Sequence, residues 1–266
     1  MINKLSHCSV KILIPLYKEI PNSHEIVSLN RCFEILSRHD ISFFTFCELD
    51  LTFYKRFNFA SIHFFDKTYF QSINGYNVLL LSKSFYEQFL NYEYILIYQL
   101  DSYVFYDALE YWCQKKYDYI GSPWMHDYSN LGLKDYAFCI FTFLKRIMRE
   151  FAIPLNANNK VGNGGFSLRK TSKFHYVLEN IDKKILRNYL KYNIDIRYNE
   201  DVFWSLEIER FKQLKLVKPT FDEALMFSID GNPNKILPYL PAMPFGCHGW
   251  SKPNQIVNWL KFIKLQ

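Results

Sequence analysis

The sequence predicts an α/β fold in which helices flank a mostly parallel central sheet. Through the first half of the chain, short apolar runs typical of buried strands alternate with stretches of helical periodicity. Strands separated by helices pair in parallel through right-handed crossovers, which place helices on both faces of the sheet. The chain has 266 residues, of which 49% are hydrophobic and 22% charged, so it can bury a large core and is not disordered throughout.

Each element has its own sequence signal. The strands are predicted from apolar runs at Val10–Tyr17, Ile41–Cys47, Ser61–Phe65 and Tyr94–Tyr98. Helices are expected at His24–His39, with Asn22 or Ser23 as the N-cap, and at Ser82–Asn91. Ligands of such sheets bind at the carboxyl ends of the strands, so residues 15–19, 48–50 and 99–103 are the first candidates for a site.

The strand pattern stops between residues 125 and 160. Residues 136–151 are apolar along one helical stripe, with Lys145, Arg146 and Arg149 beside it. A helix packed against the core is the favoured interpretation, and an element at an anionic membrane surface is the alternative. Because the chain has no internal repeat or flexible linker, we expect one domain, residues 1–266, with a helical insertion.

Composition excludes several classes of protein. No apolar run reaches the roughly 18 residues that span a bilayer, and the first residues lack a signal-peptide layout, so a cytoplasmic protein is expected. The six cysteines are scattered, which favours reduced thiols over a disulfide framework or a zinc ribbon. The net charge of +6 suits an anionic ligand, but the basic residues are too dispersed for a nucleic-acid binder.

An acidic residue, Asp101, stands at the mouth of the fourth strand. Desolvating a carboxylate costs several kcal/mol, so Asp101 must be solvated, paired with a cation or bound to a metal. A cap for the segment that begins near Tyr103 is an equally good interpretation.

A second cluster is rich in glycine. Gly162, Gly164 and Gly165 lie within four residues, shortly before Arg169. Glycine allows a ligand to approach the backbone closely, but the segment matches neither a Walker A loop nor the dinucleotide fingerprint. A hairpin turn at Asn163-Gly164 is the alternative.

Two further clusters lie nearer the C-terminus. Glu200 and Asp201 open a helix-like segment, where capping is the commoner role of such a pair and general-base catalysis is the alternative. His248 has glycines on both sides, in Gly246-Cys-His-Gly249, and is therefore accessible to a ligand or a metal.

These clusters belong to longer blocks, which are Ile14–Lys18, Ser72–Asn77, Tyr98–Phe105, Asp118–Trp124, Gly162–Arg169, Asn199–Trp204 and Phe245–Trp250. Their order resembles the layout of GT-A glycosyltransferases, and the blocks themselves are similar to those of the DUF5672 family of bacterial GT-A-like enzymes. The resemblance runs from about residue 10 to residue 250. It implies a GT-A (Rossmann-like) domain with a nucleotide-binding half at about 8–124, a helical insertion at about 125–160 and an acceptor and catalytic half at about 161–250.

The resemblance implies a metal site. In GT-A enzymes the last acid of a DxD motif binds the divalent ion that bridges the donor diphosphate, and here the motif reads Gln99-Leu-Asp101. Asp101 and His248 are the implied ligands of Mn²⁺ or Mg²⁺. A motif whose two ends are Asp101 and Tyr103 is the alternative.

The implied donor is a UDP-sugar. Lys18 or Arg169 would stabilise charge on the leaving diphosphate, and Tyr17 or Tyr76 would stack on the base. The predicted donor-binding residues are Pro15, Tyr17, Lys18, Asn74, Tyr76, Asn77, Gln99, Asp101, Tyr103, Gly164, Gly165 and Arg169.

The implied reaction is transfer of a hexose, galactose or glucose, to a surface polysaccharide such as lipopolysaccharide, O-antigen or capsule. Asp201 has the position of the general base of inverting GT-A enzymes, with Glu200 as the second choice. A lipid-linked glycan acceptor would add peripheral contact with the cytoplasmic face of the inner membrane. The alternatives are a sugar nucleotidyltransferase, which usually has a glycine-rich loop after the first strand, and a non-catalytic carbohydrate-binding protein, a class that is mostly all-β.

Overall fold

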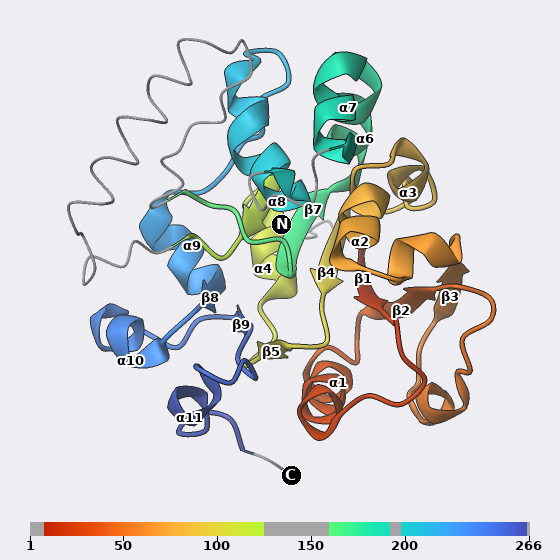
Figure 1. Cartoon of the computed structure of the whole chain (residues 1–266). Helices are drawn as coiled ribbons and strands as arrows, with labels where there is room; N and C mark the ends of the chain where they lie inside the picture. The colour runs from red at the N-terminus through yellow and green to blue at the C-terminus, as the bar shows by residue number, and fades with distance from the viewer. Residues whose placement is uncertain (1–7, 125–159, 192–197, 265–266) are drawn as a thin grey trace, which may run out of the picture.

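The computed structural model describes residues 8–124, 160–191 and 198–264 (Figure 1). Its centre is a six-stranded sheet in the order β3-β2-β1-β4-β7-β6. The parallel strands are β1 (Val10–Pro15), β2 (Asp40–Thr45), β3 (Ser61–Phe64) and β4 (Tyr94–Tyr98). β7 (Phe166–Lys170) is antiparallel to both β4 and β6 (Tyr119–Gly121). The predicted α/β class with a mostly parallel sheet is confirmed.

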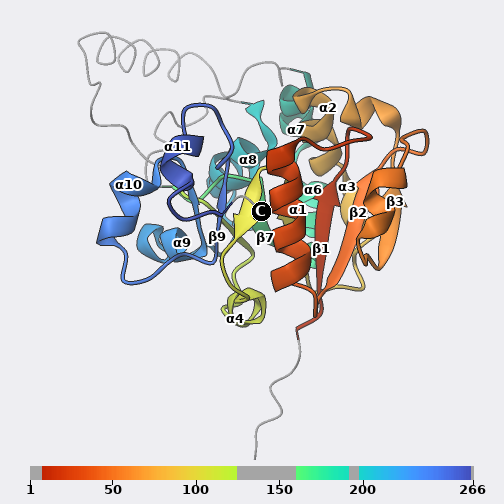
Figure 2. The same ribbon diagram turned by 90° about the horizontal axis from the view of Figure 1, so that it is seen from below.

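Helices cover both faces of this sheet (Figure 2). One face carries α1 (Ser23–Ile35), and the other carries α2 (Ile73–Leu80), α3 (Lys83–Glu87) and α6 (Thr171–Asn180). Successive side chains of β1 alternate between the two layers, so Ile12 joins a cluster with Leu29 of α1, whereas Leu13 joins one with Leu79 of α2. The central strand β4 is apolar along its whole length, as a strand buried on both faces requires.

A smaller sheet extends the molecule beyond β4. Its strands are β5 (Ser102–Val104), β9 (Gly246–His248) and β8 (Ser228–Asp230), in that order. β5 follows β4 almost directly and pairs with β9, which places His248 opposite Ser102. The C-terminal part of the chain is thus held at the end of the central strand. In the described part of the chain, the other α-helices are α4 (Leu109–Gln114), α7 (Lys183–Lys191), α8 (Glu200–Val202), α9 (Phe221–Phe227), α10 (Pro233–Ile236) and α11 (Ile256–Trp259).

Several expectations for single elements change in the structure. Asn22 is the N-cap of α1, but the helix ends at Ile35 instead of His39. The segment expected to be capped near Asp101 is strand β5, so the capping interpretation is wrong. Asn163 and Gly164 form no two-residue hairpin, because the Asn163 side chain accepts a hydrogen bond from the Gly165 amide in an irregular loop before β7.

The predicted insertion at 125–160, including the helix expected at 136–151, lies outside the described residues apart from residue 160. Within the described ranges, we find no helix with the length and apolar character of a membrane span.

Candidate functional site

A cavity of about 700 Å³ opens at the carboxyl ends of β1 and β4. β1 ends there at Pro15, and Gln99 and Asp101 follow β4. The antiparallel β7 begins at the same edge, so the loop before it brings Gly164 and Gly165 into the cavity wall. The predicted residues that line the cavity are Pro15, Tyr17, Tyr76, Asn77, Gln99, Asp101, Gly164, Gly165, Glu200, Asp201 and His248.

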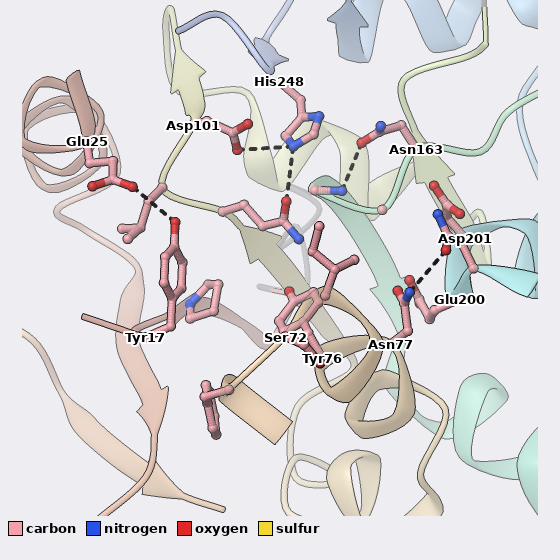
Figure 3. Close-up of a pocket in the computed structure, with 18 of the residues that line it drawn as sticks. Tyr17, Glu25, Ser72, Tyr76, Asn77, Asp101, Asn163, Glu200, Asp201 and His248 are labelled. Atoms are coloured by element: carbon pink, nitrogen blue, oxygen red, sulfur yellow. Dashed lines mark hydrogen bonds and ion pairs between the residues drawn. The ribbon is translucent and has the colours of Figure 1, made fainter. Parts of the chain in front are cut away.

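The cavity has three chemically distinct parts (Figure 3). Tyr17 and Glu25 lie at one end, and Glu200 and Asp201 lie at the other. Between them, His248 Nε2 is 3.1 Å from Asp101 Oδ1 and 3.0 Å from Gln99 Oε1. The four clusters that are far apart in the sequence therefore meet around one hollow.

His248 is held in an acidic environment. Burial opposes its charged form, but the carboxylates of Asp101 and Asp230 outweigh burial and raise the pKa of His248 to about 10. Burial likewise opposes ionisation of Asp101, and the neighbouring His248 lowers the pKa of that carboxyl. The two carboxylates therefore favour positive charge at the position of the imidazole.

Gly165 is required by this arrangement. A Cβ at this position would lie 2.1 Å from His248 Nε2 and 2.7 Å from Gln99 Oε1, which is closer than non-bonded atoms approach. A Cβ at Gly164 would lie 3.0 Å from the Arg169 guanidinium and from the Glu200 carboxylate. The glycines give the backbone its close approach to the site, as the sequence indicates.

Asp201 provides a half-buried carboxylate at the far end of the cavity. Its Oδ1 accepts a hydrogen bond from the Val202 amide at 2.8 Å. Burial, followed by the charge of Glu200, raises the pKa of Asp201 to about 7. A base with a pKa near neutrality can accept a proton at physiological pH and release it again.

Glu200 is occupied by an ion pair with Arg169, whose side chain is fully buried. Arg169 also donates to Tyr86 Oη at 2.9 Å and to Ser167 Oγ at 3.0 Å. Arg169 is fully buried and is not among the residues that line the cavity, so it does not face the space where a ligand's diphosphate was expected. Its guanidinium neutralises Glu200 instead, and it leaves Asp201 as the carboxylate available for proton transfer.

Lys18 is also absent from the cavity lining. Its ammonium is 2.8 Å from Glu25 Oε1, and the same oxygen accepts a hydrogen bond from Tyr17 Oη at 3.0 Å. Two other predicted residues, Asn74 and Tyr103, are likewise not among the lining residues. Tyr103 packs against Trp250 instead, so a motif that runs from Asp101 to Tyr103 is not formed at the cavity.

Several residues of the wall were not expected from the sequence, among them Glu25, Asn163, Asn199 and Lys252. Asn199 Oδ1 accepts a hydrogen bond from Asn77 Nδ2 at 3.2 Å. Asn163 lies in the block Gly162–Arg169, Asn199 begins the block Asn199–Trp204, and Lys252 follows His248 by four positions. Their closeness in sequence to predicted site residues was the signal that could have identified them. Glu25 had only a helix-capping signal.

Two protein groups at the centre suit a hard divalent cation. Asp101 offers a carboxylate and His248 an imidazole nitrogen, with the Gln99 amide oxygen beside them. Among residues 8–124, 160–191 and 198–264, no cluster of three or more His, Cys, Asp or Glu side chains could hold a metal by itself. The donor set therefore fits a cation that completes its coordination with water and ligand oxygens.

Comparison with solved structures shows the fold. Mouse xyloside xylosyltransferase 1, in its apo form, aligns with 93% of this chain and 98% of its own at 11% identity, with a TM-score of 0.55. The mannosyltransferase Ktr4p from S. cerevisiae, in complex with GDP, aligns with 82% of this chain and 68% of its own (12% identity, TM-score 0.43). Core-mannan synthase A from Aspergillus fumigatus, in an Mn/GDP form, aligns with 74% and 66% (11% identity, TM-score 0.41). The match to the mouse enzyme shows a glycosyltransferase-like fold.

No curated protein is significantly similar in sequence to this chain. A family model does match, over residues 59–248, and its description is "Protein of unknown function (DUF5672)". This match spans more than half of the chain. It includes all four sequence clusters, which are Asp101, the glycines at 162–165, the acids Glu200 and Asp201, and His248. The protein therefore belongs to the DUF5672 family.

Proposed function

We propose that this protein is a glycosyltransferase that moves a hexose, galactose or glucose, from a UDP-sugar to a glycan hydroxyl. The observation that carries the proposal is that Asp101 and His248, the glycine loop and Asp201 line a single cavity. The glycosyltransferase-like fold supports it. A cavity of about 700 Å³ is within the size range of small-molecule and cofactor sites.

The cavity suggests how the donor lies. Tyr17 offers a half-exposed ring for the nucleobase, and Gly164 and Gly165 leave space for the sugar next to the backbone. The diphosphate would lie between them, near Asp101, His248 and Lys252. Lys252 lines the cavity, is 3.3 Å from Asp230, and has a side chain that is 46% exposed, so its ammonium can reach a phosphate.

The acceptor would enter beside Asp201. The Asp201 carboxylate takes the proton of the attacking hydroxyl as the acceptor oxygen bonds to the anomeric carbon. The bond between that carbon and the diphosphate oxygen breaks, and UDP leaves with the electron pair. Attack from the face opposite the leaving group inverts the anomeric configuration, and the Lys252 ammonium stabilises the departing phosphate.

A divalent cation, Mn²⁺ or Mg²⁺, held by Asp101 and His248 would neutralise the charge that develops on the leaving diphosphate. Asp101 and His248 would hold it from the protein side, and the Gln99 amide oxygen stands where the first acid of a DxD motif would be.

The proposed acceptor is a surface polysaccharide or a lipid-linked glycan, and the proposed location is the cytoplasm with peripheral contact at the inner membrane. The net charge of +6 supports contact with an anionic surface. Partition of the protein onto anionic vesicles, compared with neutral vesicles, tests this part separately.

A screen of nucleotide sugars for release of the nucleoside diphosphate tests the reaction. We expect UDP-hexoses to be turned over faster than GDP- or ADP-sugars, with Mn²⁺ or Mg²⁺ increasing the rate. No release from any nucleotide sugar, with several glycan acceptors present, would contradict the proposal.

A further inference from the structure

Asp230 is a largely buried carboxylate that lies behind His248. Its side chain is 21% exposed, and it stands in register with His248 where β8 pairs with β9. Asp230 Oδ2 is 3.6 Å from His248 Nδ1, whereas Asp101 and Gln99 face the other ring nitrogen, Nε2. Within the described residues, His248 Nδ1 is buried without a hydrogen-bond partner, and the carboxylate that faces it is Asp230. Because an imidazole binds an ion through one nitrogen, a ligand role for Nε2 leaves Nδ1 to this carboxylate.

The carboxylate of Asp230 belongs to a closed ring of contacts. Its Oδ2 accepts a hydrogen bond from Asn163 Nδ2 at 2.7 Å, and Asn163 Oδ1 accepts one from the Gly165 amide at 2.9 Å. The Gly165 carbonyl accepts a hydrogen bond from the backbone amide of Gln99 at 2.9 Å, and the side-chain oxygen of Gln99, Oε1, lies 3.0 Å from His248 Nε2. Hydrogen bonds therefore link the glycine loop (Asn163–Gly165) to Asp230 on one side and, through Gln99, to the imidazole on the other, and the 3.6 Å approach of Asp230 to Nδ1 closes the ring.

We propose that Asp230 is the positioning residue of His248. It holds the proton of the imidazole at Nδ1 and orients the lone pair of Nε2 into the cavity, where a divalent cation shared with the donor diphosphate would bind. Through Asn163, the same carboxylate couples this orientation to the loop that faces the donor sugar. The inference rests on the proposed function, because the cation belongs to the proposed donor site.

Lys252 supplies a matched control. Its ammonium contacts the same carboxylate through the other oxygen, Oδ1, at 3.3 Å. Lys252→Met therefore removes a charged partner of Asp230 without touching the contact between Asp230 and His248. Asn163→Ala provides a second test, because it keeps the carboxylate and removes the 2.7 Å hydrogen bond that fixes it.

The experiment measures Mn²⁺ binding to the full chain in the presence of UDP, by the loss of the free Mn²⁺ electron paramagnetic resonance signal. The spin-echo modulation from ¹⁴N then reports whether an imidazole is bound to the ion. Asp230→Asn is expected to weaken Mn²⁺ binding by about 10- to 100-fold and to change the modulation at saturating Mn²⁺. Lys252→Met should leave the modulation at saturating Mn²⁺ unchanged, and His248→Ala should abolish it.

An unchanged modulation in Asp230→Asn at saturating Mn²⁺ would overturn the inference. Loss of the Asp230 charge alone would weaken Mn²⁺ binding but would not reorient the His248 imidazole, so it would leave the modulation as it is. If Asp230→Asn does not fold, Asn163→Ala provides the decisive test. A several-fold loss of Mn²⁺ affinity in Asn163→Ala would support the inference, whereas wild-type Mn²⁺ binding and modulation would contradict it. Absence of imidazole modulation in the wild-type protein would refute the ligand role of His248 and this inference with it. The transferase proposal would then be judged by release of UDP alone.

Discussion

Asp201 and Glu200 are neighbours in the chain but have different chemical environments. Glu200 is neutralised by the buried Arg169, whereas the half-buried Asp201 carboxylate faces the cavity and its pKa is raised to about 7. The sequence could name both acids as candidates, but it could not show which one Arg169 would neutralise. That distinction depends on packing between β7 and α8, which brings together residues 31 positions apart.

Asp201→Asn should leave UDP binding nearly intact and reduce transfer by about 10²- to 10⁴-fold, because the amide cannot accept the acceptor proton. Turnover and UDP affinity, measured by product release and calorimetry, check this. Asp222→Asn, an exposed acid at the start of α9, is the matched control and should have wild-type turnover. Normal transfer by Asp201→Asn would return Glu200 to consideration.

The pH dependence of kcat/KM should report the same carboxylate. Asp201 acts as a base only when ionised, so kcat/KM should rise with pH and level off above about 7, where its pKa lies. The residual activity of Asp201→Asn should lack this inflection. A wild-type profile that falls between pH 6 and 8 would contradict the assignment of Asp201 as the base.

Gly165→Ala should cost more function than Gly164→Ala. The new Cβ would lie 2.1 Å from His248 Nε2 in the first variant, against 3.0 Å from the nearest atoms in the second. We therefore expect Gly165→Ala to lose Mn²⁺-dependent UDP binding while Gly164→Ala retains part of it. Equal affinities in the two variants would show that His248 is free to move.

Among the elements, β4 is the one for which sequence and structure agree at both ends. Its five residues are apolar and bounded by polar neighbours, and burial on both faces requires that pattern. α2 was not expected, because Gly75 and two asparagines lower its intrinsic helix propensity. The Ser72 side chain caps it locally, and Leu79 and Leu80 pack into the core. That packing is a tertiary contact, which a local pattern does not reveal.

The capping box of α1 gives a prediction at this scale. The Asn22 side chain accepts from the Glu25 amide, while Glu25 accepts from the Asn22 amide. Asn22→Ala should lower the free energy of unfolding by about 1 kcal/mol, and Asn22→Ser, which keeps a capping oxygen, by much less. Urea denaturation measures both, and equal losses would argue against the cap.

The buried pair between β7 and α8 should matter more for stability. Arg169→Met leaves the Glu200 carboxylate buried without its partner, so the free energy of unfolding should fall by about 3–5 kcal/mol. Adding Glu200→Gln to Arg169→Met should restore part of the loss, because the uncompensated charge is removed. A double variant no more stable than Arg169→Met would contradict this account.

At the scale of the whole molecule, the topology explains why so much of the site could be located from sequence. Ligand positions follow from strand order, so Pro15, Gln99 and Asp101 could be placed at one edge before any coordinates. The antiparallel β7 and the smaller sheet add Gly165 and His248 to that edge. Lys18 follows β1 as the sequence predicted, but its ammonium forms an ion pair with Glu25 on α1 instead of facing the cavity. The sequence did not reveal this ion pair.

If the whole domain encloses the donor, UDP and Mn²⁺ together should raise the thermal midpoint by more than the sum of their separate effects. Ligand at about 100 times its Kd contributes about 2.7 kcal/mol of stability to the folded state. Differential scanning fluorimetry checks this, with Asp101→Ala as the variant expected to lose the joint effect. Purely additive shifts would argue against a shared site.

The pairing of β5 with β9 has a consequence for synthesis. Ser102 of the central region can pair with His248 only after the long stretch of chain between them has been translated. A ribosome-bound chain that ends before β8 contains every strand of the large sheet but lacks His248, Asp230 and Lys252. The proposed donor site is therefore complete only once β8 and β9 have been synthesised and have docked beside β5.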